Sequence, residues 1–268
     1  MPFPRPSSAK LPAHSIPAAK TSAVTTSGAQ VELPIPRWVI SDTHWGHRPI
    51  LEWYPWRQAF LQGASVGAAL WPPLVPFASA EHLRCRLDVI LSTLVHKTTF
   101  TPSLPDTSRE LVLHDEVLIA AWNEVVAPDD WVLHLGDVAM GRWTQDRRAL
   151  RQRLHGRIIL VLGNHDCSVS AAQQEGFDVV LRRHAFFHPQ LGHVVCHHNP
   201  CNFIREDPNR YNLFLHGHCH GREPDARIPE PLRRRSIDAS MDHLRIPHPV
   251  PLYDLLRWKQ AQLAASPL

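Results

Sequence analysis

Side chains that can bind metal ions follow five short apolar segments of this sequence, each time directly after the carboxyl end of the segment. One such residue is ordinarily a turn or helix-capping residue. Five successive occurrences instead indicate a shared site, because ligands bind at the carboxyl ends of the strands in an open α/β sheet. The segments are residues 37–40, 131–135, 157–162, 193–196 and 212–216, and the motifs that follow them are SDTH, GD, GNHD, HHNP and GHCH.

The spacing within two of these motifs is suited to binding one ion. Asp42 and His44 are two positions apart, and so are His218 and His220. In extended backbone, residues at this spacing project to the same side of the chain. Oxygen and imidazole donors without a thiolate suit Mn²⁺, Fe or Zn²⁺ in a catalytic setting. The donors outnumber what one ion uses, which predicts two ions with a bridging carboxylate. They are Asp42, His44, Asp137, Asn164, His198, His218 and His220.

The elements that must position these residues are strands that alternate with helices. The five apolar segments are short, rich in β-branched or aromatic residues and bounded by turn residues, which predicts strands. Residues 108–126 have apolar side chains at helical spacing and stop before Pro128. We expect Thr144 to cap a second helix, and Ser168 to cap a third that ends near Gly176. This alternation predicts an α/β fold.

The composition fits one large domain. The chain has 268 residues, of which 44% are hydrophobic, so it can bury a sizeable core. With 28 basic and 25 acidic residues, its net charge of +3 does not require a nucleic acid or an anionic membrane as partner. Arginines gather at 142–157, 182–183 and 233–235 and could hold polyphosphate or nucleic acid, although such runs are usually solvated faces.

The five cysteines favour neither a disulfide framework nor a structural zinc ribbon, because they are odd in number and lack C-x-x-C spacing. A zinc site formed by Cys196, Cys201, Cys219 and a nearby histidine is an alternative. A free cysteine more often packs as a small apolar residue. We therefore expect a reducing compartment, the cytoplasm.

Two segments stand apart from the α/β pattern. Residues 1–36 contain seven prolines and no acidic residue before Glu32, which predicts a disordered arm. Residues 37–268 then form the domain, with a Pro- and Trp-rich insertion at about 55–107. Residues 58–80 carry no charge, but their glycines and prolines argue against a membrane span. We expect an apolar loop that serves as a lid or docking surface, with plain core packing as the alternative.

Taken in order, D-x-H, G-D, G-N-H-D, H-x-P and G-H-x-H resemble the motifs of the calcineurin-like metallophosphoesterases over residues 37–220. The stretches SDTHWGH and WNEVVAPDDWVLHLGDVAMG are similar to the compact bacterial and phage-type members of that family. SIDASMDHLRIPHPVPLYDLL resembles the closing strand and helix of the family. The resemblance implies a four-layer α/β/β/α sandwich of two mixed sheets, with a two-metal site at the carboxyl ends of the strands.

The resemblance also implies a role for each residue of the motifs. His165 binds no metal and would protonate or stabilise the leaving oxygen. The H-x-P motif selects His198 as ligand, while His197 remains an alternative. The ions would be Mn²⁺, with Fe, Zn²⁺, Ni²⁺ and Co²⁺ as alternatives. One ion would be held by Asp42, His44 and His220, the other by Asn164, His198 and His218, with Asp137 bridging both.

These expectations favour a metal-dependent hydrolase that acts on a phosphodiester, a nucleotide or a related small phosphate through a hydroxide activated by two metals. The GD motif continues as VAMGR, without the Asp and Arg of the phosphoprotein phosphatases, which argues against a protein phosphatase. A nuclease or nucleotide pyrophosphohydrolase is the nearest alternative. An inactive sandwich that serves as a partner-binding scaffold is the alternative from another class. The sequence leaves open the substrate, the preference for monoesters or diesters, the native metal and the oligomeric state.

Overall fold

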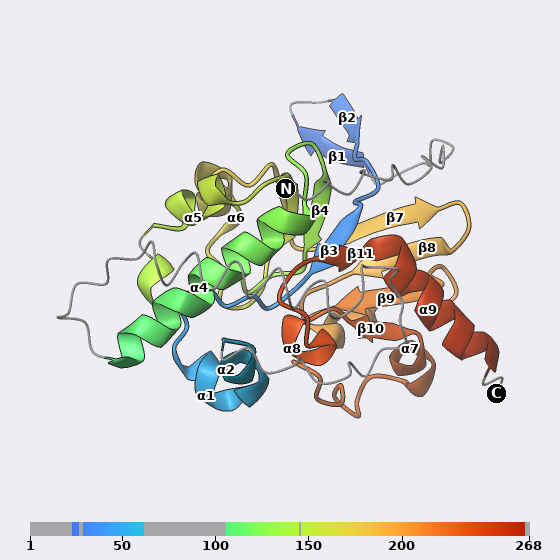
Figure 1. The fold of residues 1–268 in the computed structure, drawn as a ribbon. Helices are drawn as coiled ribbons and strands as arrows, with labels where there is room; N and C mark the ends of the chain where they lie inside the picture. The colour runs from blue at the N-terminus through green and yellow to red at the C-terminus, as the bar shows by residue number, and fades with distance from the viewer. Residues whose placement is uncertain (1–22, 27–28, 62–105, 145, 266–268) are drawn as a thin grey trace, which may run out of the picture.

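A computed structural model describes residues 23–26, 29–61, 106–144 and 146–265 of the chain. These residues form a mixed α/β fold around two mixed sheets (Figure 1). The predicted fold class is therefore confirmed.

The larger sheet places the ends of its parallel strands side by side. In its register, Ile40 lies opposite His134, which lies opposite Leu160. The residues that follow these positions therefore emerge along one edge of the sheet. The strand order is β11 (Val250–Pro251), β3 (Trp38–Ile40), β4 (Trp131–His134), β5 (Arg157–Val161) and β6 (Val179–Leu181), with only β11 antiparallel to its neighbour.

The smaller sheet is also mixed. Its three neighbouring parallel strands end with Cys196, His216 and Asp238, of which the first two lead into the HHNP and GHCH motifs. The strand order is β10 (Ser236–Asp238), β9 (Leu213–His216), β8 (Gly192–Cys196) and β7 (His184–His188), with only β7 antiparallel to its neighbour.

The two sheets pack face to face through a buried apolar core. Val39, Leu133 and Ile159 of the larger sheet pack in one cluster with Val194 and Leu215 of the smaller sheet. The helix α9 (Leu252–Ala265) closes this cluster with three buried leucines. Residues of β3 and β5 alternate between this core and the opposite face of the sheet, as the pleat requires.

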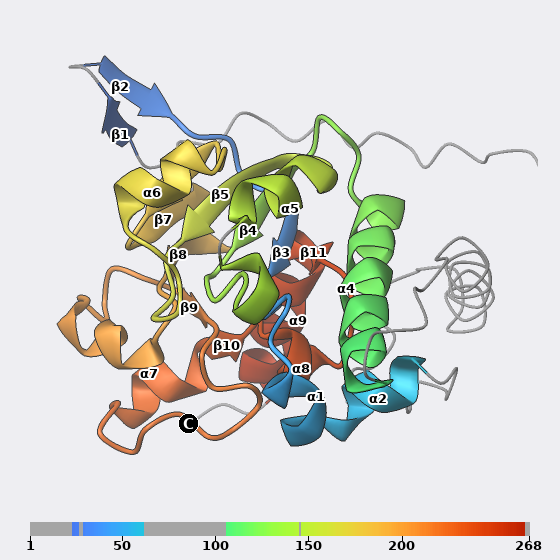
Figure 2. The same cartoon turned by 90° about the vertical axis from the view of Figure 1, so that its left-hand side faces the viewer.

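Helices cover the outer face of each sheet. Ile158 and Leu160 of the larger sheet pack against Leu118 and Trp122 in a second core. The helices on this side are α4 (Asp106–Val125), α5 (Arg147–Arg153) and α6 (Val169–Gln174). The 3₁₀ helix η2 (Pro200–Arg205) and α7 (Glu230–Arg234) pack on the smaller sheet in a third core. Figure 2 shows α7 on the opposite side of the molecule from α4. The four predicted layers are therefore helices, larger sheet, smaller sheet and helices, and one apolar core lies between each pair of neighbouring layers.

Ser168 caps α6 as predicted, since its hydroxyl accepts a hydrogen bond from the Ala171 amide. The cap predicted at Thr144 is wrong. Thr144 closes the short 3₁₀ helix η1 (Gly141–Trp143), and the side chain of Asp146 caps α5 by accepting from the Ala149 amide. An aspartate carboxylate at a helix N-terminus also interacts favourably with the helix dipole.

Part of the segment predicted to be a disordered arm has regular structure. β1 (Ala23–Thr26) pairs antiparallel with β2 (Ala29–Glu32). Leu33 is buried in the core between the sheets. The expected boundary at residue 37 is therefore too late, because the core needs apolar surface from residues before it. Residues 1–22 lie outside the described residues.

The expected insertion begins inside the folded domain. Trp56 and Leu61 of α2 (Pro55–Leu61) pack on the core beside α4. α2 follows α1 (Pro49–Trp53), and both lie near α8 (Met241–Leu244) in Figure 1. Most of the uncharged stretch, and its predicted role as lid or docking surface, lies outside the described residues. No described helix has the length and apolar character that crossing a membrane requires.

Candidate metal centre

The seven candidate ligands gather at the carboxyl ends of the strands, as the motif order predicts. They come from the segments that follow β3, β4, β5, β8 and β9. Six of them form two groups in which the potential ligand atoms all lie within 4.8 Å of one another. The first group is Asp42, His44 and His220, and the second is Asp137, His198 and His218.

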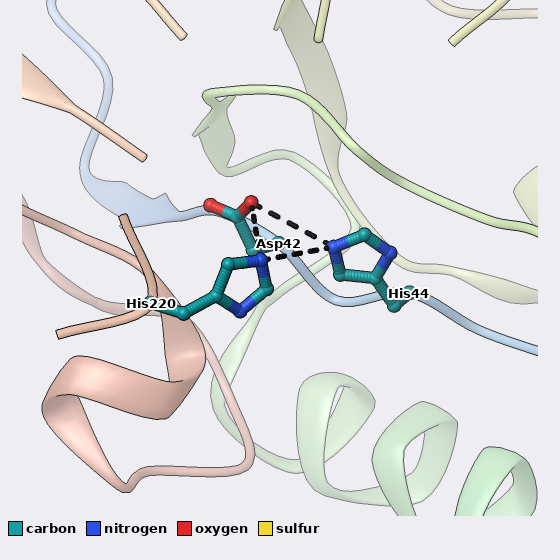
Figure 3. A group of neighbouring side chains, drawn as sticks. All are labelled: Asp42, His44 and His220. Atoms are coloured by element: carbon teal, nitrogen blue, oxygen red, sulfur yellow. Dashed lines mark hydrogen bonds and ion pairs between the residues drawn. The ribbon is translucent and has the colours of Figure 1, made fainter. Parts of the chain in front are cut away.

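In the first group, two imidazoles face one carboxylate oxygen (Figure 3). Oδ2 of Asp42 accepts a hydrogen bond from the amide of His218. Oδ1 of Asp42 has no hydrogen-bond partner in the described chain and lies 3.3 Å from Nε2 of His220 and 3.7 Å from Nε2 of His44. The two Nε2 atoms are 3.3 Å apart. A buried oxygen without a partner beside two converging nitrogens fits a divalent cation.

The amide oxygen of Asn164, the seventh candidate ligand, lies close to both histidines of the second group. Oδ1 of Asn164 is 3.0 Å from Nε2 of His198 and 2.9 Å from Nδ1 of His218. Nδ1 of His198 donates to the Leu135 carbonyl at 2.7 Å, so its Nε2 is left to face the group. A second hydrogen bond of this kind sets the tautomer and ring orientation of a metal-binding histidine.

Asp137 belongs to the second group and also faces the first. Its Oδ2 is 3.4 Å from Nε2 of His198 in the second group and 3.7 Å from Nε2 of His44 in the first. Its Oδ1 accepts a hydrogen bond from the amide of His165 at 2.9 Å, which fixes the carboxylate. The carboxylate of Asp137 therefore faces one histidine of each group.

Five of the candidate ligands have left-handed backbone conformation, with φ between 50° and 68°. The spacing argument assumed extended backbone and is wrong on this point, although the side chains still converge. Each non-glycine residue in this region costs about 1–3 kcal/mol and persists where the surroundings over-determine it. Arg245 is the one other such residue in the described chain. The five are Asp42, His44, Asp137, His218 and His220.

Asp166, the last residue of GNHD, holds the backbone around Asp137. Its carboxylate accepts from the amides of Asp137 at 2.8 Å, Val138 at 3.0 Å and Gly163 at 2.8 Å. Arg147 donates to Asp166 and to the carbonyl of His165, at 3.0 Å and 2.9 Å. The two loops that carry the bridging candidate and the GNHD motif are therefore joined by one carboxylate.

Arg57 and Asp242 complete the surroundings of the first group, and sequence reasoning missed both. Nδ1 of His220 donates to Asp242 at 2.6 Å. Arg57 is fully buried and donates to Asp242 and to the carbonyls of Asp42 and Thr43. The one available signal was that Arg57 is the last charged residue before the uncharged stretch.

The carboxylates set the charge of two ligand histidines. Burial alone would lower the pKa of His198, but Asp137 and Asp42 raise it to about 9. Burial likewise opposes protonation of His220, and hydrogen bonds to Asp242 and Asp42 raise its pKa to about 9. Burial opposes ionisation of Asp42, but His220 and His44 hold its pKa well below the usual value. The centre thus attracts positive charge, which protons supply when no metal is bound.

The remaining candidates are placed differently. His165 has a 44% exposed side chain, with Nε2 4.0 Å from Oδ2 of Asp137, so it borders the centre on the solvent side. His197 turns away and pairs with Glu206 at 2.7 Å. His198 therefore belongs to the group, and His197 does not. Among the described residues, the groups that could hold a metal include no cysteine, which removes the support for a Cys196, Cys201 and Cys219 zinc site.

The two groups of potential metal ligands and one comparison with known proteins support a metal-dependent phosphoesterase domain in general. Residues 112–239 match the family model of the calcineurin-like phosphoesterases, a range that covers every motif except the first. This match, which spans slightly less than half of the chain, supports the metallophosphoesterase superfamily for this part of it. No curated protein matches the sequence. A solved structure of a protein of unknown function from Aquifex aeolicus is similar, with 19% identity, a TM-score of 0.47, and coverage of 82% of this chain and 97% of the other.

Proposed function

We propose that this protein hydrolyses a phosphodiester, a nucleotide or a related small phosphate at a centre of two divalent ions. The observation that carries the proposal is that the carboxylate of Asp137 lies within 3.7 Å of a histidine from each of the two ligand groups. Asp42, His44 and His220 would hold one ion. Asn164, His198 and His218 would hold the other.

Divalent ions at such a centre supply charge that offsets the phosphoryl oxygens, and they activate water as a nucleophile at neutral pH. The protein contributes two carboxylates to the ligand set, so the loaded centre keeps a net positive charge for a phosphate anion. Mn²⁺ is the proposed metal. The cytoplasm is the proposed compartment, because the cysteines described above favour a reducing environment.

His165 is the proposed general acid. Its amide donates to Asp137 and its carbonyl accepts from Arg147, so its backbone is held at the centre. Its side chain is 44% exposed, with Nε2 4.0 Å from Oδ2 of Asp137, so it borders the centre on the solvent side. It would donate a proton to the leaving oxygen, which is the step that an alkoxide leaving group needs most.

Turnover of bis(p-nitrophenyl) phosphate tests the proposal. The protein is stripped with a chelator and reloaded with Mn²⁺, Ni²⁺, Co²⁺ or Zn²⁺, and metal content is measured in parallel. We expect turnover with at least one of these metals at about two ions per chain. If metal binds but neither this diester nor a phosphomonoester is turned over, the proposal is overturned. An inactive sandwich that serves as a partner-binding scaffold is then favoured. A nuclease would cut single-stranded oligonucleotides with steep salt dependence.

A further inference from the structure

A pocket of about 440 Å³ opens beside the candidate metal centre, and the function proposed above does not use it. Its walls come from the segments after β5, β6 and β8 and from η2, so it lies along the same strand ends as the ligands. The residues used below are Leu162, Arg182, Arg183, His197, Arg205 and Glu206.

The pocket borders the second ligand group. Leu162 precedes Asn164 by two residues, and His197 directly precedes His198. Two residues of chain span at most about 7 Å, so the pocket wall is within that distance of the backbone of Asn164. The amide of Leu162 donates to the Leu181 carbonyl at 2.8 Å, which places the segment after β6, with Arg182, beside this wall.

One arginine and the acidic residue of the pocket neutralise each other. Arg183 donates to both carboxylate oxygens of Glu206, at 2.6 Å and 2.9 Å, and also to the hydroxyl of Tyr211. Nε2 of His197 contacts the same carboxylate at 2.7 Å. Glu206 is therefore fully engaged and cannot neutralise a further cation.

Two arginines of the pocket are left uncompensated. Arg182 and Arg205 are exposed. No hydrogen bond or ion pair joins either side chain to another residue in the described part of the chain. Two guanidinium groups without a hydrogen-bond or ion-pair partner in the described chain thus line the pocket, together with the paired side chains of Arg183, His197 and Glu206. A guanidinium fork matches the geometry of phosphate oxygens.

We infer that this pocket binds a second phosphate of the substrate, so that the preferred substrate is a phosphate ester with a phosphate beyond the one attacked. This inference rests on the proposed phosphoesterase function, because it assigns the scissile phosphate to the metal centre. It names Arg182 and Arg205 as residues that determine specificity.

A matched pair of esters tests the inference with the Mn²⁺-loaded enzyme. Thymidine 3′-(p-nitrophenyl phosphate) and its 5′-phosphorylated form release the same leaving group and differ only in the second phosphate. We expect the 5′-phosphorylated ester to show a KM roughly 10-fold lower, since two exposed charge contacts contribute modestly. Arg182→Ala combined with Arg205→Ala should abolish this difference, while kcat/KM for bis(p-nitrophenyl) phosphate stays within about two-fold.

The control variant combines Arg157→Ala with Arg257→Ala. It removes the same charge from the opposite end of β5 and from α9, so it should keep the KM difference. Equal KM values for the two esters in an active wild type would overturn the pocket assignment and leave the phosphoesterase proposal standing. If no ester is turned over, the phosphoesterase proposal fails. In that case, binding of thymidine 3′,5′-bisphosphate is measured by calorimetry. Binding that is lost in the pocket variant and kept in the control variant supports the anion site. Equal binding to both variants overturns it.

Discussion

Arg57 and Asp242 form a bidentate ion pair from which solvent is excluded. Nε of Arg57 lies 2.7 Å from Oδ1 of Asp242, and Nη2 lies 2.8 Å from Oδ2, with both side chains 0% exposed. Asp242 also accepts from His220, and Arg57 donates to the carbonyl of Asp42. The pair therefore orients two of the three candidate ligands of the first group.

We expect Asp242→Asn to weaken metal binding at the first group by about 10- to 100-fold, because His220 loses the carboxylate that orients its ring. Metal affinity is measured by competition with a chelator. Asp225→Asn is the control, since Asp225 forms an exposed ion pair with Arg227. Equal weakening of both ions, or none, would contradict an orienting role confined to the first group. A melting curve without metal separates this effect from a general loss of stability.

Asp137→Asn should leave the protein with less than one tightly bound ion per chain. The substitution removes the charge of a side chain that faces a histidine of each group, and an amide cannot replace a bridging carboxylate. Elemental analysis after dialysis measures the outcome, again with Asp225→Asn as control. Two fully occupied ions in the variant would refute the bridging assignment.

The HH doublet offers a matched pair of adjacent substitutions. His198→Ala should lower metal content, because Nε2 of His198 faces Asn164 and Asp137. His197→Ala should leave metal content near wild type, because His197 pairs with Glu206 instead. The reverse pattern would move the site to His197.

His165→Ala should lower kcat most for esters whose leaving oxygen depends most on protonation. For a ribose alkoxide, we expect kcat to fall by about 10²- to 10⁴-fold. A p-nitrophenolate leaves without protonation, so the loss on that ester should be clearly smaller. Metal content should not change. Equal losses on the two esters, or loss of an ion, would show that His165 has another role.

His134 should make the fold sensitive to acid. It is buried, accepts from the Gly136 amide through Nδ1, and bonds Thr43 through Nε2, which fits only the neutral ring. Burial lowers its pKa to about 4 from 6.5. Because the folded pKa is the lower one, its contribution to stability is present above pH 6.5 and declines as the pH falls toward 4.

The expected loss from His134 is about 3 kcal/mol by pH 4. Urea unfolding of the metal-free protein between pH 7 and pH 4 measures it. His134→Asn keeps an acceptor but cannot be protonated, so its stability should fall less steeply over this range. Parallel curves for wild type and variant would contradict the assignment.

Local sequence patterns were enough to predict the α/β class and the set of residues that meet at the centre. The five strands that precede the motifs are each marked by a short apolar run, and each candidate ligand by its place shortly after one. Other strands, among them β6 (Val179–Leu181) and β7 (His184–His188), were not predicted. In parallel strands of matched register, that place is enough to bring residues together, as Ile40, His134 and Leu160 show. The sequence therefore determined which residues converge without any knowledge of their conformation.

The tertiary structure alone decided how those residues are held. Arg57 and Asp242 are 185 positions apart, and only the packing of α2 against α8 makes them partners. The left-handed backbone of Asp42 and Asp137 has no local signature, because non-glycine residues adopt it only when surrounding contacts impose it. The free charge of Arg182 and Arg205 likewise follows from Glu206 being taken by Arg183 and His197. Such partnerships depend on distances between distant segments, which spacing along the chain does not encode.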